Sequence, residues 1–168
     1  ITANCMQNER YKKDTLIYLS ALQLMSVIIK PVAVAAADRI DPQTQKAWRS
    51  EFGQPGKVPL ALIVNSLIEL TELQPLRAIL QETNKLLHWG YYLAFHRQNL
   101  AGTTDTLCKY TWQAYLYLEA RDIEGFSTYL AICFSYILET IRDFIIQHGL
   151  QEAAKLATPY KIPDLNIK

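Results

Sequence analysis

The stretch PLRAILQETNKLLHWGYYLAFHRQ, residues 75–98, decides how the chain is expected to fold, because its two faces differ most clearly. At helical spacing, one face gathers the apolar or small residues Leu76, Ile79, Leu80, Leu87, Gly90 and Ala94. The other face gathers Arg77, Gln81, Lys85, His88, Tyr92 and His96, and Arg97 follows them. The stretch therefore predicts a helix that packs on one side and presents a polar, mildly basic and partly aromatic surface on the other.

Helical periodicity continues over most of the chain, and no segment alternates with period two for long enough to predict a strand. Asp41 followed by Pro42 is a helix-start signal, and Pro31 and Pro75 are each expected either to kink a helix or to separate two helices. The helices are predicted over 8–39, 41–52, 59–75, 75–98, 105–121 and 126–148. The sequence thus predicts one all-α domain over residues 1–168, a single helical bundle of about five to seven helices.

Composition indicates a cytoplasmic protein with partners. Half of the 168 residues are apolar and 20% are charged, which is enough for a core and favours additional burial against other subunits. The formal net charge of +1 gives no global attraction to nucleic acid or to an anionic membrane, so such binding would need a local patch. Cys5, Cys108 and Cys133 lie far apart, which predicts reduced core thiols in a cytosol.

The N-terminal region does not read as a membrane span or a signal peptide. Gln23, Lys30 and Pro31 interrupt the apolar run over 16–37, and a charge in mid-bilayer costs about 2.5–3.5 kcal/mol on insertion scales. The run is also long for a signal peptide and lacks a small-residue cleavage site. We therefore expect a buried helix, and the start at Ile1 is expected of a fragment or of a processed or internally started product.

No catalytic or metal-binding constellation stands out. His88 and His96 are eight residues apart, a helical rise of roughly 12 Å, which is too far for one metal ion. The chain has no HExxH pair, no Gly-rich phosphate loop and no GxSxG elbow. We expect a protein that is not an enzyme and that needs no cofactor or metal. The enzyme alternative would use His88 or His96.

The polar face of 75–98 is the best candidate for contact with nucleic acid. Cations at successive turns can follow a phosphate backbone, while aromatic rings among them stack on bases. The candidate residues are Arg77, Lys85, His88, Tyr92, His96 and Arg97, with a second basic group formed by Lys46, Arg49 and Lys57. The alternative is an ordinary solvated helix face, in which Glu82 pairs with Lys85 three residues later.

Aromatic residues leave a second question open. The ten tyrosines and three tryptophans, among them Trp48, Trp89 and Trp112, are typical either of a protein interface or of an aromatic-rich bundle core. An interface would make the chain a helical adaptor that binds proteins without nucleic acid.

Two segments resemble the C-terminal helical part of the large subunit of type I-D CRISPR effector complexes, a region also produced separately as the small subunit. The first is LIYLSALQLMSVIIKPVAVAAADR, residues 16–39, in which a small-residue run follows Lys30 and Pro31. The second is KYTWQAYLYLEARDIEGFSTYLAICFSYILETIR, residues 109–142, in which a short acidic junction separates an aromatic helix from a long final helix.

This resemblance implies a non-catalytic helical bundle that stacks in several copies within a guide-RNA complex. The basic surfaces of such subunits hold the displaced DNA strand or the backbones of guide and target. The expected partners are therefore other subunits, copies of the chain itself, and guide RNA or single-stranded DNA. The modest basicity of this chain departs from that pattern, and several weak patches in a row would compensate for it.

Overall fold

The computed structural model describes residues 9–54, 58–95 and 101–147, and these residues form helices joined by short connections, without a strand. The α-helices are α1 (Glu9–Ala36), α2 (Pro42–Glu51), α3 (Leu60–Glu69), α4 (Gln74–Phe95), α5 (Ala101–Glu119) and α6 (Ile123–Gln147), and a 3-10 turn, η2 (Ala37–Arg39), follows α1. The all-α prediction and the expected number of helices are confirmed.

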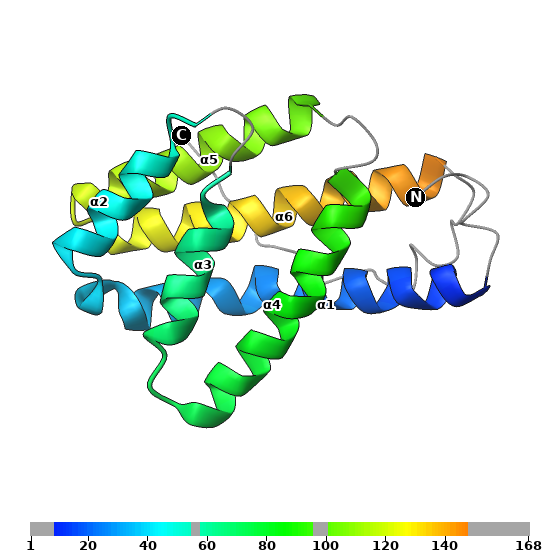
Figure 1. Ribbon diagram of the computed structural model, residues 1–168, viewed down its shortest axis with the longest axis horizontal. Helices are drawn as coiled ribbons and strands as arrows, with labels where there is room; N and C mark the ends of the chain where they lie inside the picture. The colour runs from blue at the N-terminus through cyan, green and yellow to red at the C-terminus, as the bar shows by residue number, and fades with distance from the viewer. Residues whose placement is uncertain (1–8, 55–57, 96–100, 148–168) are drawn as a thin grey trace.

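Two long helices, α1 and α6, lie side by side along the long axis of the molecule (Figure 1). Helix α5 packs on α6, and α2, α3 and α4 lie across the face turned to the viewer in Figure 1. Helix α4, the amphipathic helix that the sequence singled out, crosses α1 steeply. The molecule is therefore a layer of α1, α5 and α6 covered on one face by α2, α3 and α4.

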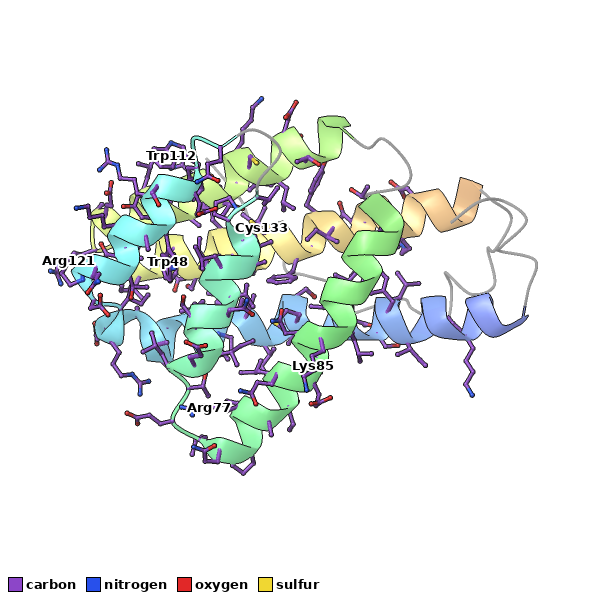
Figure 2. All side chains as sticks on the ribbon, viewed as in Figure 1. Trp48, Arg77, Lys85, Trp112, Arg121 and Cys133 are labelled. Atoms are coloured by element: carbon purple, nitrogen blue, oxygen red, sulfur yellow. The ribbon has the colours of Figure 1, made fainter. Side chains whose placement is uncertain are left out.

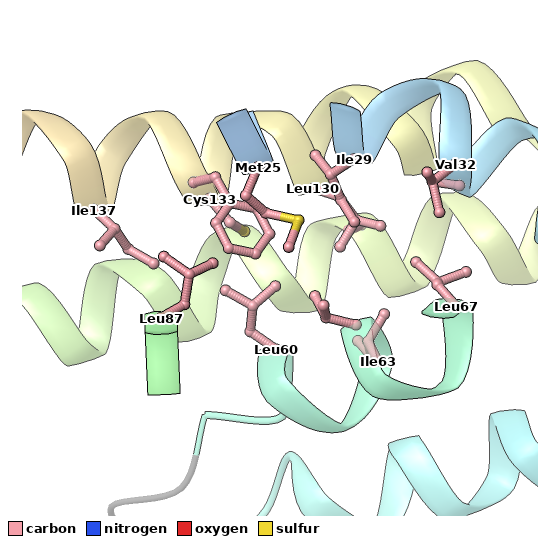
Figure 3. Packing of buried hydrophobic residues seen from close by; sticks show 14 of the residues in the cluster. Met25, Ile29, Val32, Leu60, Ile63, Leu67, Leu87, Leu130, Cys133 and Ile137 are labelled. Atoms are coloured by element: carbon pink, nitrogen blue, oxygen red, sulfur yellow. The ribbon is translucent and has the colours of Figure 1, made fainter. Parts of the chain in front are cut away.

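The core lies between these layers, and Figure 3 shows its centre. It is built from aliphatic side chains of every long helix, including Leu19, Leu22, Met25, Ile29, Ile63, Leu67, Leu80, Leu87, Leu107, Leu130 and Ile137. Trp48 holds α2 to this core: its ring is 1% exposed, and its Nε1 donates a hydrogen bond to Ser66 Oγ on α3 at 3.2 Å. Burying an indole with its donor satisfied is favourable, so Trp48 fixes the place of a helix that is otherwise mostly polar.

The predicted start of α2 is confirmed in detail. The Asp41 carboxylate accepts hydrogen bonds from the backbone N–H of Thr44 at 2.7 Å and from the Thr44 hydroxyl at 3.0 Å, and Pro42 occupies the first helical position. These bonds lower the pKa of Asp41, because they favour the charged carboxylate. An unpaired donor at the helix end is satisfied in this way.

Pro31 and Pro75, each expected either to kink a helix or to separate two helices, behave differently. Helix α1 continues through Pro31, so no second helix begins there. Residues 70–73 separate α3 from α4, and Pro75 lies in the first turn of α4, where a missing backbone donor costs nothing. Pro75 therefore marks a helix start.

Two predicted helix starts are wrong by three or four residues. Helix α5 already includes Ala101, four residues before the predicted start at 105. Helix α6 begins at Ile123 because Asp122 caps it, its Oδ1 accepting the backbone N–H of Gly125 at 2.8 Å. Local signals of this kind compete along a sequence, and helix ends are the least predictable part of a fold.

The junction between α5 and α6 is a tight backbone turn. Arg121 has a φ of 58°, its N–H donates to Leu118 O at 3.0 Å, and the N–H of Asp122 donates to Tyr117 O at 2.9 Å. These paired bonds and the left-handed residue are those of a Schellman motif, which closes the end of α5. Gly125 then passes so close to Tyr117 that an added Cβ would lie 2.4 Å from ring atom Cδ1. The junction therefore brings α5 and α6 into direct contact along their length.

One segment of the described residues, Leu16–Arg39, has the length and hydropathy of a membrane span. Half of its most apolar window is buried within the bundle, mainly against α6 and α4. That is the expected behaviour of a core helix, which passes the same hydropathy test.

Candidate nucleic-acid interface

Arg77 joins two helices and does not stand free on the surface. From the first turn of α4, its Nε donates to Thr71 O and its Nη2 donates to Glu69 O, both at 2.8 Å. These carbonyl oxygens belong to the C-terminal end of α3 and the connection after it, where helix carbonyls lack partners. Figure 2 shows Arg77 at this connection, below Lys85. Its guanidinium is thus largely used within the fold.

Lys85 remains at the surface but is paired. Its Nζ lies 2.6 Å from Glu82 Oε1, and both side chains are exposed. This is the i,i+3 pair that the sequence offered as the alternative to nucleic-acid contact. An exposed pair of this kind is worth at most about 1 kcal/mol, so a phosphate can replace the carboxylate at little cost.

Several predicted residues of the α4 surface lie outside the described part of the structure. His96 and Arg97 follow the last described residue of α4, and Lys57 lies between α2 and α3. The backbones of His88 and Tyr92 belong to α4, but their side chains are not described. Arg77 and Lys85 are therefore the part of this predicted stripe whose geometry is known.

A second basic group is better placed for contact with a ligand. Lys46 and Arg49 follow each other on one side of α2, and both are exposed. Arg49 Nη1 lies 3.2 Å from Glu119 Oε1 at the end of α5, and Arg121 comes two residues after Glu119, exposed at the same end of the bundle (Figure 2). We call Lys46, Arg49 and Arg121 the α2-end basic group. Sequence patterns alone missed Arg121, because it lies far from Lys46 and Arg49 in the sequence, in the connection between α5 and α6.

Glu119 connects this group to the interior. Its Oε1 also accepts a hydrogen bond from the Tyr115 hydroxyl at 2.8 Å. Burial of the ring, together with the hydrogen bond to Glu119, raises the pKa of Tyr115 to about 12, so the phenol stays neutral and donates this bond. Glu119 is therefore held on both sides, and it orients Arg49 toward the exposed end of the bundle.

The described aromatic residues pack in the core or against it. Phe52, Trp112 and Tyr115 pack on one another, with centroid distances of 4.9 Å for Phe52–Trp112 and 5.4 Å for Trp112–Tyr115. A second cluster joins α5 to α6 through Tyr110, Tyr117, Tyr129 and Tyr136. All of these rings are buried or half-buried. The rings therefore support the core, and because the half-buried ones also keep exposed area, an aromatic interface stays a prediction.

Exposed apolar surface is instead aliphatic and is concentrated on α1. Ile17, Leu24, Val27 and Val34 are each 43–47% exposed, although the opposite side of the same helix is core. The sequence placed Ile79 on the packing face of α4, and that prediction is wrong, because Ile79 is 52% exposed. Each of these helices has more apolar surface than the fold covers.

Both described cysteines are free thiols, and Cys133 is buried whereas Cys108, predicted as a core thiol, is only half-buried. Burial raises the pKa of Cys133 to about 12, and Cys133 Sγ lies 3.6 Å from Thr111 Oγ1. Burial and the nearby Asp105 carboxylate raise the pKa of Cys108. A thiol with a raised pKa is a poor nucleophile and metal ligand. Cys5 lies outside the described residues.

Two further features concern metal binding and ligand binding. Within ranges 9–54, 58–95 and 101–147, no three His, Cys, Asp or Glu side chains gather as a metal site would require. An apolar cleft of about 530 Å³ opens between α1, α3, α4 and α6, with Asn65, Asn84 and Lys85 as its polar lining. Asn84 Nδ2 donates to Asn65 Oδ1 at 2.6 Å, which ties α4 to α3 beside this cleft.

Comparison of the chain with protein-family models, with curated proteins and with solved structures gives no significant match.

Proposed function

We propose that this chain is a non-catalytic small subunit of an RNA-guided DNA-targeting complex of the CRISPR type. In this proposal, copies of the bundle associate with one another and with larger subunits, and a basic surface contacts the backbone of single-stranded nucleic acid. The strand contacted is the displaced DNA strand or the guide and target pair. The all-α fold and the type I-D resemblance of residues 16–39 and 109–142 support it.

The observation that carries the nucleic-acid part is the α2-end basic group. Lys46 and Arg49 lie one turn apart on α2, Arg49 pairs with Glu119 at the end of α5, and Arg121 follows in the α5–α6 connection. All three cations are exposed. Lys46 and Arg121 have no carboxylate within ion-pair distance among the described residues. Three adjacent cations are enough for weak contact with a phosphate backbone, and repetition over several copies would strengthen it.

The described cations of α4 have a smaller role in nucleic-acid contact than the sequence predicted. Arg77 donates two of its five N–H groups to carbonyl oxygens of the α3 end, which holds its guanidinium in place within the fold. Lys85 remains accessible beside Glu82. His88, Tyr92, His96, Arg97 and Lys57 stay candidates on sequence grounds alone.

A second candidate function is a protein-interaction module that binds no nucleic acid. The observation that favours it is charge balance: Lys30, Arg39, Arg49 and Lys85 each pair with a glutamate. Exposed aliphatic residues on α1 provide surface for a protein partner. In this alternative, the paired cations serve only the fold.

Isolation of the tagged full chain from its native cells at low salt separates the two functions. The bound nucleic acid is extracted and sequenced, and the bound proteins are identified. A matched chain carrying Lys46→Gln, Arg49→Gln and Arg121→Gly serves as the control, with glycine chosen because it accepts the φ of 58° at position 121.

Short RNAs of uniform length, recovered together with several larger proteins and depleted in the control, are the result expected of a guide-RNA complex. Recovery of proteins without nucleic acid would overturn the proposal and favour the interaction module. Equal recovery of RNA with both chains would place the contact elsewhere on the molecule and remove the α2-end basic group from the proposed function.

A further inference from the structure

The exposed side of α1 carries a regular seam. Starting at Ile17, exposed residues recur at alternating intervals of three and four: Ile17, Ser20, Leu24, Val27, Pro31 and Val34. We call this set the α1 outer stripe. Intervals of three and four are those of a heptad repeat, by which two helices pack along a shared seam. The opposite side of the helix, with Leu19, Leu22 and Met25, is already used by the core.

The polar members of this stripe do not prevent burial. The Ser20 hydroxyl donates to Leu16 O within its own helix at 2.9 Å, so it needs no outside partner. Pro31 has no backbone donor at all. Lys30, beside the stripe, is paired with Glu124 of α6 at 2.5 Å. The stripe can therefore be covered without leaving an unpaired donor or charge among these groups.

The stripe also matches itself in reverse. When a second copy of α1 lies antiparallel, with Leu24 opposite Val27 of that copy, Ile17 falls opposite Val34 and Ser20 opposite Pro31. Leu24–Val27 and Ile17–Val34 are aliphatic pairs, and Ser20–Pro31 joins a small residue to a larger one. Because the same pairs form in both directions, one two-fold axis between Leu24 and Val27 generates the whole contact.

Charges at the two ends fit the same arrangement. The heptad intervals place exposed Lys13 four residues before Ile17 and exposed Asp38 four residues after Val34, in η2. The antiparallel register sets Lys13 of one copy opposite Asp38 of the other, at both ends of the seam. Neither side chain has an ion-pair partner among the described residues of its own copy. A parallel register would instead set lysine against lysine and aspartate against aspartate.

We propose that two copies of this chain pair through the α1 outer stripe in an antiparallel, two-fold arrangement closed at each end by Lys13 and Asp38. The inference deepens the proposed function and rests on it only in that copies of the chain associate. It requires no nucleic acid. A seam of roughly 26 Å on one helix is small, so the pair is expected to be weak, dissociating in the micromolar range or above.

Sedimentation equilibrium of the full chain, without nucleic acid and at low salt, tests the pairing over about 1–500 µM. The wild-type chain is expected to shift from monomer to dimer. Leu24→Glu puts two carboxylates into the seam and should weaken pairing at least about tenfold. Ile79→Glu changes an exposed aliphatic residue on α4, 52% exposed against 43% for Leu24, and as the matched control it should leave pairing unchanged.

Charge exchange tests the register. Lys13→Glu alone and Asp38→Lys alone each create like charges at both ends, and each should weaken pairing by roughly two- to tenfold. The double variant, Lys13→Glu with Asp38→Lys, should restore it. A parallel seam predicts no such restoration, because each end would still carry two like charges. Circular dichroism confirms that all variants keep their helical content.

A wild-type chain that stays monomeric throughout this range would overturn the inference, as would insensitivity to Leu24→Glu or failure of the double variant to recover. Flotation of the monomer with neutral lipid vesicles, lost in Leu24→Glu, would assign the stripe to a membrane surface instead. If copies do not pair through the α1 outer stripe, the proposed function still stands, because strand contact by the α2-end basic group is measured separately. If that strand contact is absent, the inference of pairing is unaffected.

Discussion

Residues at the α5–α6 junction show how much a single position controls. Arg121 adopts a left-handed backbone, Asp122 caps the following helix, and Gly125 lets Tyr117 approach. Three neighbouring positions thereby fix the angle between two helices whose packing supplies much of the core. The sequence showed a short acidic junction between two helices, but it could not show that Gly125 lies inside α6 and that its missing side chain is needed for packing.

Gly125→Ala is therefore expected to destabilise the fold by about 1–3 kcal/mol, since a Cβ at 2.4 Å from the Tyr117 ring forces that ring or the backbone to move. Urea unfolding followed by circular dichroism measures the change. Gly53→Ala is the control, because nothing lies within 4 Å of its added Cβ, and it should be neutral within about 0.5 kcal/mol. Equal effects of the two substitutions would show that Tyr117 can give way freely.

Cys133 makes stability depend on pH at the alkaline side. Its pKa rises from 9.0 to about 12 on folding, mainly through burial. Below pH 9 the thiol is protonated in the folded and the unfolded state, so its contribution to the free energy of unfolding is fully present. Between pH 9 and 12 the unfolded thiol loses its proton first, so the free energy of unfolding falls by up to about 1.4 kcal/mol per pH unit for this group.

Urea unfolding at several pH values between 8 and 10.5 checks this, with Cys133→Ala as the comparison. The variant loses some stability at every pH because a cavity forms, but its decline above pH 9 should be shallower than that of the wild type. Parallel declines in the two chains would contradict the assignment. Tyr115, whose pKa rises from 10.0 to about 12 through burial and Glu119, adds to the slope in both.

At the scale of elements, α4 carries a role that its amphipathic pattern did not reveal. Arg77 binds the carbonyl oxygens at the end of α3, so a residue predicted to touch a ligand instead holds two helices together. Arg77→Ala should cost about 1.5–3 kcal/mol of stability, because two charge-assisted hydrogen bonds are lost. Thermal and urea unfolding measure it.

Lys85→Ala, a lysine on the same helix with an exposed carboxylate partner, is the matched comparison and should cost no more than about 1 kcal/mol. A cost for Arg77→Ala as small as that for Lys85→Ala would show that the carbonyl contacts contribute little. The comparison also explains why Arg77→Ala is a poor probe of nucleic-acid binding: a loss of binding could not be separated from a loss of fold.

Helical periodicity predicted most elements, and the capping signal at Asp41 and Pro42 predicted one helix start to the residue. Periodicity failed where a helix is apolar on both sides. In α1 it could not decide that Leu22 packs inward while Leu24 and Val27 face outward, because the choice depends on which neighbours arrive. Sequence periodicity could not predict the α2-end basic group for the same reason. Arg121 shares an end of the bundle with Lys46 and Arg49 only because α2 contacts the end of α5.

At the scale of the molecule, the α2-end basic group and the α1 outer stripe belong to different elements. The α2-end basic group lies where α2 meets the α5–α6 junction, and the α1 outer stripe runs along one side of the longest helix (Figure 1). A two-fold pair through α1 would carry two such basic groups, one from each copy. Contacts with a strand would then add at high effective concentration, which offsets a net charge of only +1 per chain.

The salt dependence of strand binding tests the basic group directly. For single strands, each phosphate contact contributes about 0.7 to the slope of log K against log salt, so removing three contacts should lower that slope by about 2. The measurement uses the full chain and a labelled single strand of about 16 nucleotides, comparing wild type with the chain carrying Lys46→Gln, Arg49→Gln and Arg121→Gly.

Lys109→Gln removes an equally exposed lysine from α5, away from the α2-end basic group, and should leave the slope within experimental error of wild type. Leu24→Glu in the otherwise wild-type chain should weaken strand binding, because an unpaired copy offers one α2-end basic group where a pair offers two. The α2-end basic group of each copy is itself unaltered by this substitution. An unchanged slope in the triple variant would mean that the strand binds elsewhere, and the first residues to substitute would then be Lys85, His88 and Tyr92 on α4.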